Sequence, residues 1–154
     1  MLRILAVLCV LPLAIGCGNG NVQVYPVSGQ VRFNGEPMQG GGGIALVPTS
    51  PTSGQAAGGV IDEMGNYTLS TYGEGDGSMV GEFRVMITQT VMKEPEPTKD
   101  GEAAPKPAKA VPDDKRIPLI YADPKGSPLI IKVEPKVNDI PLELDRQFQK
   151  PAGA

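Results

Sequence analysis

Side chains that usually carry enzymatic chemistry are scarce in this chain. Its 154 residues include no histidine and only two cysteines, Cys9 and Cys17. Without histidine, the Ser-His-Asp and Cys-His arrangements and the usual zinc sites cannot be built. The glycine-rich stretches 40–43 and 73–77 lack the Gly-Lys-Ser/Thr ending of a phosphate-binding loop and precede predicted strands, so we interpret them as turns. The sequence predicts a protein that is not an enzyme and needs no cofactor.

Carboxylates offer the remaining site chemistry. Asp62 and Asp76 lie in polar, glycine-containing stretches and could supply oxygen ligands to calcium, which takes about six to eight of them. Met64, however, stands where a calcium loop needs oxygen, and Asp, Asn and Gly are also the usual residues of β-turns. An acid–base pair would require a desolvated cleft that separates the two pKa values, and nothing nearby indicates one. We therefore predict that Asp62 and Asp76 stabilise turns and that there is no metal site. Calcium binding by these two carboxylates is the alternative.

Aromatic residues are the other candidate binding groups. Sandwich domains that recognise carbohydrate or peptide commonly use exposed aromatic rings, and the candidates here are Tyr25, Tyr72 and Tyr121. Tyr67 and Phe83 alternate with polar neighbours, which predicts core positions for both. Surface tyrosines without a ligand are common, so the binding interpretation stays an alternative.

The N-terminal segment has the layout of a secretory signal. Residues 1–16 hold a basic start at Arg3, an apolar run over 4–13, and small residues before Cys17. This run is too short to span a hydrocarbon core, which needs about 20 apolar residues, and it contains a proline. We expect residues 1–16 to be a removed signal peptide and residues 17–26 to form a tether.

Cys17 follows the sequence LAIG, residues 13–16, which resembles the lipobox of bacterial lipoproteins. The resemblance implies that Cys17 becomes N-terminal and carries a thioether-linked diacylglycerol and an acylated amine. Two or three acyl chains give lasting attachment to a membrane. The alternative is a soluble secreted protein with a free thiol, because Cys9 would leave with the signal. In some bacteria an aspartate directly after the lipidated cysteine is associated with retention at the inner membrane. This chain has Gly18 at that position, which suggests that the lipoprotein is placed in the outer membrane.

Charge and composition restrict the partner classes. The formal net charge is -3, which gives no electrostatic reason to bind nucleic acid. Twenty glycines and sixteen prolines indicate many turns and few helices.

Strand-like alternation recurs from Val27 onward. In Val27–Phe33 apolar and polar residues alternate, and Asn34-Gly35 then supplies the two positive-φ positions of a tight hairpin turn. The four glycines before Ile44 suit a bulge or a close approach of backbones. Further predicted strands or regular segments are 44–47, 55–61, 67–70, 82–87, 117–121, 129–133 and 140–144.

Residues 93–116 interrupt this pattern with prolines and balanced charges. They hold almost nothing apolar, which predicts a solvated insertion rather than a second domain. The predicted fold is all-β, a seven-stranded two-sheet sandwich over residues 27–146 with a C-terminal tail at 147–154.

Several blocks carry a family resemblance. In chain order they are VSGQVRFNGEPMQGGGGIALVP, GGVIDEMGNYTLST, GEGDGSMVGEFRVMI, IPLIYADPKGSPLIIKV and NDIPLEL. Together they resemble small lipoproteins, frequent in planctomycete bacteria, with a carboxypeptidase-regulatory-like or transthyretin-like β-sandwich. The family pattern includes Gly29, Gly35, Pro37 and Gly40 in the first hairpin, Asp62, Gly65 and Tyr67 in the central turn, and Asp76, Gly77 and Gly81 before the long strand.

The resemblance implies a structural or binding module at the cell surface. We therefore expect a lipid-anchored, extracytoplasmic, non-catalytic structural or adhesion module of the cell envelope. Its expected partners are the membrane, through the N-terminal lipid, and an envelope protein or polysaccharide. The alternative is an envelope domain that binds carbohydrate or calcium.

Overall fold

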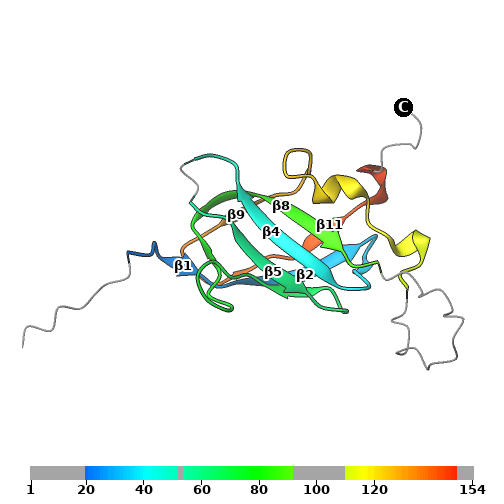
Figure 1. Ribbon diagram of the computed structural model, residues 1–154, viewed down its shortest axis with the longest axis horizontal. Coiled ribbons are helices and arrows are strands. Elements are labelled where there is room, and N and C mark those ends of the chain that lie inside the picture. Colours follow the sequence, from blue (N-terminus) through cyan, green and yellow to red (C-terminus); the bar gives the residue numbers. More distant parts are fainter. Residues whose placement is uncertain (1–19, 52–53, 92–109, 149–154) are drawn as a thin grey trace, which may run out of the picture.

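The computed structural model of the protein describes residues 20–51, 54–91 and 110–148 (Figure 1). The expected signal peptide with Cys9, the candidate lipidation site Cys17 and most of the expected Pro-rich insertion lie outside the described residues. Within the described ranges, no helix is long and apolar enough to cross a membrane.

Strands dominate the described residues, which confirms the all-β prediction. The strands are β1 (Val24–Tyr25), β2 (Val27–Phe33), β3 (Glu36–Pro37), β4 (Gly42–Pro48), β5 (Ala57–Ile61), β6 (Asn66–Thr68), β7 (Ser78–Met79), β8 (Gly81–Gln89), β9 (Ile130–Val133), β10 (Asn138–Asp139) and β11 (Leu142–Leu144). Three short 3-10 helices accompany them: η1 (Asp113–Lys115), η2 (Leu119–Ala122) and η3 (Arg146–Phe148).

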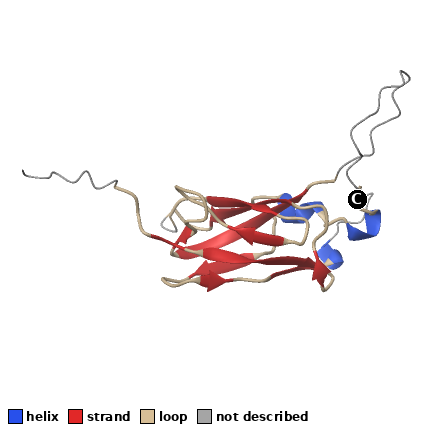
Figure 2. Cartoon of the chain, turned by 90° about the horizontal axis from the view of Figure 1, so that it is seen from below, coloured by secondary structure: helices blue, strands red, loops and turns tan. Residues whose placement is uncertain are grey.

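Nine of these strands form one curled sheet in the order β10-β2-β6-β5-β4-β8-β9, with β3 and β11 also paired to β2. A separate two-stranded ribbon joins β1 to β7. Seen from below, strands lie above one another, with the 3-10 helices gathered toward one end (Figure 2). The prediction of seven strands in two sheets is not confirmed, because hydrogen bonding continues from β6 through β5 into β4.

β2 and its hairpin follow the sequence pattern closely. Val27, Val31 and Phe33 are buried, whereas Arg32 is exposed. The turn residues Asn34 and Gly35 have φ values of 51° and 81°, as a two-residue hairpin turn requires, and β3 returns to pair with β2.

β8 is the longest of these strands, with nine residues. It pairs with β4 on one side and β9 on the other, and Phe83, Val85 and Ile87 are fully buried. Tyr67 of β6 is also buried, and its hydroxyl donates to the Ile140 carbonyl at 2.6 Å. The predicted core positions of Tyr67 and Phe83 are confirmed.

The four-glycine run allows backbones to approach closely. A Cβ at Gly42 would overlap the Thr88 carbonyl oxygen of β8, and one at Gly40 would lie 2.8 Å from the Thr90 carbonyl oxygen. Gly40 also has a φ of +83°, which favours glycine. The predicted close approach is therefore present.

Tyr121 differs from expectation. It belongs to η2 rather than to a strand and is only 1% exposed, so its interpretation as an exposed binding residue was wrong. Its hydroxyl donates to the Asp145 carbonyl at 3.1 Å and accepts the Asp145 N–H at 2.8 Å. Pro118 precedes the turn and Pro124 follows it, and proline cannot donate to a strand ladder.

The end of the expected solvated insertion also packs on the domain. Val111 is buried, and Lys115 forms a 2.5 Å ion pair with Glu36. Val111 and Lys115 therefore contact the rest of the domain, whereas the other residues of 110–116 are exposed.

Candidate functional site

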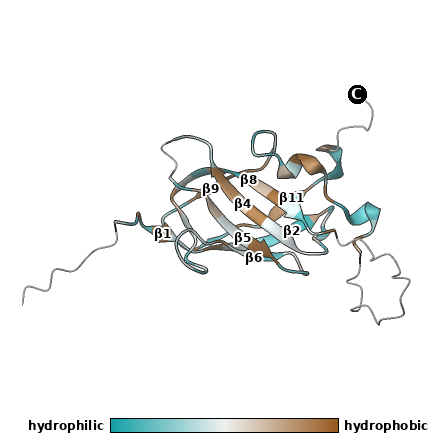
Figure 3. Cartoon of the chain, viewed as in Figure 1, coloured by the Kyte–Doolittle hydropathy of each residue, from teal (hydrophilic) through white to brown (hydrophobic). Residues whose placement is uncertain are grey.

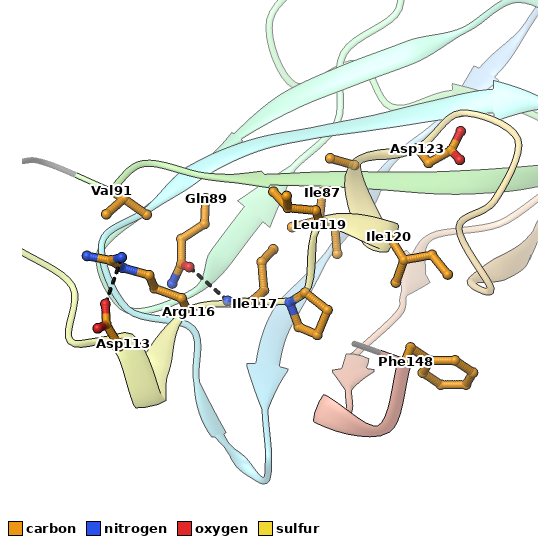
Figure 4. A pocket seen from close by; sticks show the side chains of 12 residues that line it. Ile87, Gln89, Val91, Asp113, Arg116, Ile117, Leu119, Ile120, Asp123 and Phe148 are labelled. Atoms are coloured by element: carbon orange, nitrogen blue, oxygen red, sulfur yellow. Dashed lines mark hydrogen bonds and ion pairs between the residues drawn. The ribbon is translucent and has the colours of Figure 1, made fainter. Parts of the chain in front are cut away.

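A hollow of about 840 Å³ opens between the end of β8 and the segment that carries η1 and η2 (Figure 4). Most of its lining is apolar. The lining residues are Ile87, Gln89, Val91, Asp113, Arg116, Ile117, Pro118, Leu119, Ile120, Ala122, Asp123 and Phe148.

Gln89 positions one wall of the hollow. Its side-chain oxygen accepts the Ile117 N–H at 3.0 Å, and its amide nitrogen donates to the Lys115 carbonyl at 3.1 Å and to the Gln39 carbonyl at 2.8 Å. These bonds hold the proline-bounded segment alongside the end of β8. The short η2 then leaves Leu119 88% exposed at the rim, and Figure 3 colours η2 as hydrophobic and η1 as hydrophilic.

Charged groups on the rim are already paired within the protein. Arg116 forms a 2.7 Å ion pair with Asp113, and its Nε donates to the Val111 carbonyl. Asp123 accepts the Lys125 N–H at 2.9 Å, and this bond, with a further one from Gly126, holds the pKa of the Asp123 carboxyl below its usual value. The hollow is therefore chemically suited to an apolar group rather than to an ion.

Asp62 closes the turn between β5 and β6. Its Oδ1 accepts the N–H groups of Met64 and Asn66, both at 2.8 Å, and its Oδ2 accepts the Asn66 side-chain amide at 3.0 Å. The side-chain bond from Asn66, followed by the backbone bond from the same residue, lowers the Asp62 pKa. The carboxylate thus caps its own turn.

Asp76 does the same in the loop before β7. It accepts the N–H groups of Thr71 at 2.7 Å, Gly73 at 2.8 Å and Tyr72 at 3.0 Å. The bond from Thr71 contributes most to lowering the Asp76 pKa. Among the described residues, no group of three or more His, Cys, Asp or Glu side chains could hold a metal ion.

A second hollow of about 880 Å³ lies over β5 and β6. Its lining includes Asp62, Asn66, Thr68, Ser70 and Glu74, together with glycines of β5 and of the following loop. The structure therefore brings Asp62 and Glu74 to one shallow surface, although Asp76 itself does not line it.

The three candidate tyrosines do not form one binding platform. Tyr25 is half-buried in β1, and Tyr72 is 39% exposed with its hydroxyl accepting the Val22 N–H at 3.2 Å. Tyr121 is buried within η2, and the ring of Phe148 meets its ring edge-on, with 6.2 Å between the ring centroids. Only Tyr72 presents a substantially exposed ring.

Sequence reasoning did not identify the apolar hollow. Its lining comes from three separate stretches, and only folding places Val91, Leu119 and Phe148 together. The available signal was the apolar run Ile117–Tyr121, because Pro118 inside it and Pro124 after it disfavour a central strand. Cys17 lies outside the described residues, so its lipidation stays a prediction.

Comparison of the chain with protein-family models, with curated proteins and with solved structures found no match.

Proposed function

We propose that the protein is a lipid-anchored, extracytoplasmic β-domain that serves as a non-catalytic structural or adhesion module of the bacterial cell envelope. Its partner would be an envelope protein or polysaccharide. We also propose that the domain belongs with the carboxypeptidase-regulatory-like or transthyretin-like seven-stranded sandwiches of small lipoproteins. The order of the sequence blocks and the all-β fold support this grouping.

The observation that carries the proposal is the short distance along the chain from Cys17 to the fold. Residues 18–23 alone separate Cys17 from β1. β1 pairs with β7, and the Tyr72 hydroxyl fixes the Val22 N–H, so the last part of the expected tether belongs to the domain. A lipid on Cys17 would hold the domain by its β1 end, while η1 and η2, whose residues help to line the apolar hollow, lie toward the opposite end (Figure 1).

The carboxylates support a structural rather than a chemical role. Asp62 and Asp76 each accept three hydrogen bonds from their own turns, and these bonds stabilise the charged form that closes the loop. A general acid needs the reverse, a raised pKa that keeps a proton available near neutral pH.

Cys17→Ser is the test. Expressed in a bacterial host with its own signal, the variant should move from the membrane fraction to the soluble fraction while its circular dichroism stays that of a β-protein. Cys9→Ser is the matched control, because a residue removed with the signal should not affect attachment. Retention of the Cys17→Ser variant in membranes would contradict the anchor.

Carbohydrate binding is a second candidate, favoured by the polar side chains that line part of the hollow over β5 and β6. Carboxylate, amide and hydroxyl groups from Asp62, Asn66, Thr68 and Glu74 line one shallow surface there, as sugar hydroxyls would require. Titration with envelope polysaccharides should then give binding that Glu74→Gln weakens and that Glu63→Gln, an exposed neighbour outside the hollow, leaves intact. Equal binding by both variants would remove this candidate.

A further inference from the structure

Exposed apolar side chains surround the point where the chain enters the fold. Val22 is 61% exposed just before β1, Val80 is 44% exposed between β7 and β8, and Val137 is 71% exposed in the turn between β9 and β10. We call Val22, Tyr72, Val80 and Val137 the entry surface.

Hydrogen bonds tie the four parts of the entry surface together. Val24 of β1 pairs with Met79, next to Val80, and the Val22 N–H donates to the Tyr72 hydroxyl. The Asn138 N–H, next to Val137, donates to the Pro26 carbonyl at 2.9 Å. All of these segments lie at the β1 end of the domain in Figure 1.

We propose that the entry surface rests on the lipid headgroup layer of the membrane that holds Cys17, an inference that depends on the proposed lipid anchor. The length of chain outside the described residues is the first argument. Val22 follows Cys17 by five residues, and a fully extended chain spans at most about 3.6 Å per residue, so Val22 lies within roughly 18 Å of the lipid-bearing residue. The end of the domain that contains β1 therefore has to stay beside the membrane.

Side-chain chemistry is the second argument. Valines and a partly exposed tyrosine suit the boundary between headgroups and acyl chains, where apolar area leaves water and a phenol hydroxyl can stay hydrated. Lys136 lies in the same turn as Val137 but forms a 2.5 Å ion pair with Glu134, so these two charges offset each other. Contact with the membrane accordingly comes from apolar area and not from attraction to anionic lipid.

The anchor makes such a small surface sufficient. A tethered contact is intramolecular, with an effective concentration set by the short linker, so a patch too weak to bind membranes alone can stay engaged. An apolar patch facing another protein would not need this position beside the tether.

The test uses the full, lipidated protein in phosphatidylcholine vesicles. Because Cys17 is acylated, a single new cysteine can be labelled with an environment-sensitive fluorophore in Val137→Cys. Matched controls are Leu119→Cys at the opposite end and Val60→Cys, a 78% exposed valine on β5. Lipids with a headgroup spin label should quench the fluorophore at position 137 several-fold more than at 119 or 60.

A second variant addresses the contact itself. Val80→Asp combined with a label in Val22→Cys should lower the quenching at position 22, whereas Val60→Asp in the same background should leave it unchanged. Both variants alter exposed positions, so circular dichroism should show folded protein.

Flotation of the vesicles separates the two proposals. Protein that floats with equal quenching at positions 137, 119 and 60 would overturn the membrane contact and leave the anchor standing. Protein that does not float would overturn both. A label at 137 that responds to protein concentration and not to spin-labelled lipid would assign the entry surface to self-association and would also overturn the proposal.

Discussion

Exposed apolar side chains occur at both ends of the β-domain but are arranged differently. Around β1 they lie on four separate segments of the chain. At the other end Val91, Leu119 and Phe148 line one hollow, held together by η2 and by Gln89. A flat scatter of apolar groups suits a broad surface such as a membrane, whereas a concave one suits a single inserted group.

The two ends also depend on different supports. The end with the apolar hollow is held by the buried ring and the hydroxyl of Tyr121. The β1 end is held by the close approach of the Gly77 backbone to Tyr25, which only glycine permits. Substitutions that remove one support at a time should therefore separate the two ends.

Tyr121→Ala should have the largest effect. The variant removes a fully buried ring and its two hydrogen bonds to Asp145, which should cost about 3–5 kcal/mol of unfolding free energy. Tyr121→Phe keeps the ring and should cost about 1 kcal/mol. Urea unfolding measures both. Wild-type stability in Tyr121→Ala would show that this ring does not hold the hollow end.

Gly77→Ala should come next and should act at the β1 end. Gly77 has a φ of +95°, and a Cβ there would overlap the Tyr25 carbonyl of β1. The expected cost is about 1–3 kcal/mol, with faster amide exchange at Val24 and Tyr25. The matched control is Gly35→Ala, because Gly35 has a similar φ of +81° but open space around the Cβ. Equal exchange in β1 for both variants would contradict the close approach as the cause.

Asp76→Ala should lower the melting temperature in a pH-dependent way. Hydrogen bonds from Thr71 and its neighbours lower the Asp76 pKa in the folded state, so this stabilisation is present above the unfolded pKa and is lost as pH falls through the folded value. The difference from wild type should be greatest at neutral pH and shrink below about pH 4.

Glu74→Ala, in the same loop, is the control for Asp76→Ala. If the melting temperature of Asp76→Ala were below that of wild type by the same amount from neutral to acid pH, the turn role of Asp76 would be contradicted. A calcium-dependent rise in melting temperature that Asp76→Ala or Asp62→Ala abolishes would instead support the calcium-binding alternative.

Leu119→Asp should have the smallest effect on stability. The side chain is almost fully exposed at the rim of the hollow, so the unfolding free energy should change by no more than about 0.5 kcal/mol. Ile87→Ala, at the buried floor of the same hollow, should cost about 2–5 kcal/mol. A large loss in Leu119→Asp, measured by thermal melting, would mean that Leu119 packs against the protein.

Local sequence patterns predicted a strand well where alternation within that strand alone determines which of its side chains are buried. The alternation in Val27–Phe33 and in Glu82–Ile87, and the Asn34-Gly35 turn, depend on neighbouring residues alone. Sheet order was beyond reach, because period-two alternation identifies the faces of a strand but not its neighbours. The continuous path through β5 therefore could not be predicted.

Site residues show the same division. The turn roles of Asp62 and Asp76 follow from local hydrogen bonds and were predicted. Tyr121 was misassigned because its hydroxyl bonds to the backbone of Asp145, which is distant in sequence. The hollow was missed because its lining segments meet only in the fold. Lipidation of Cys17 is a prediction from local sequence that awaits a chemical measurement.

Intact mass spectrometry of the N-terminal peptide, from protein expressed with its own signal in a bacterial host, tests the central claim most directly. The account predicts a peptide that begins at Cys17 and carries the added mass of a diacylglycerol and an acyl chain. An unmodified peptide, whether cut elsewhere or still bearing Met1, would contradict the lipid anchor and the membrane contact that depends on it.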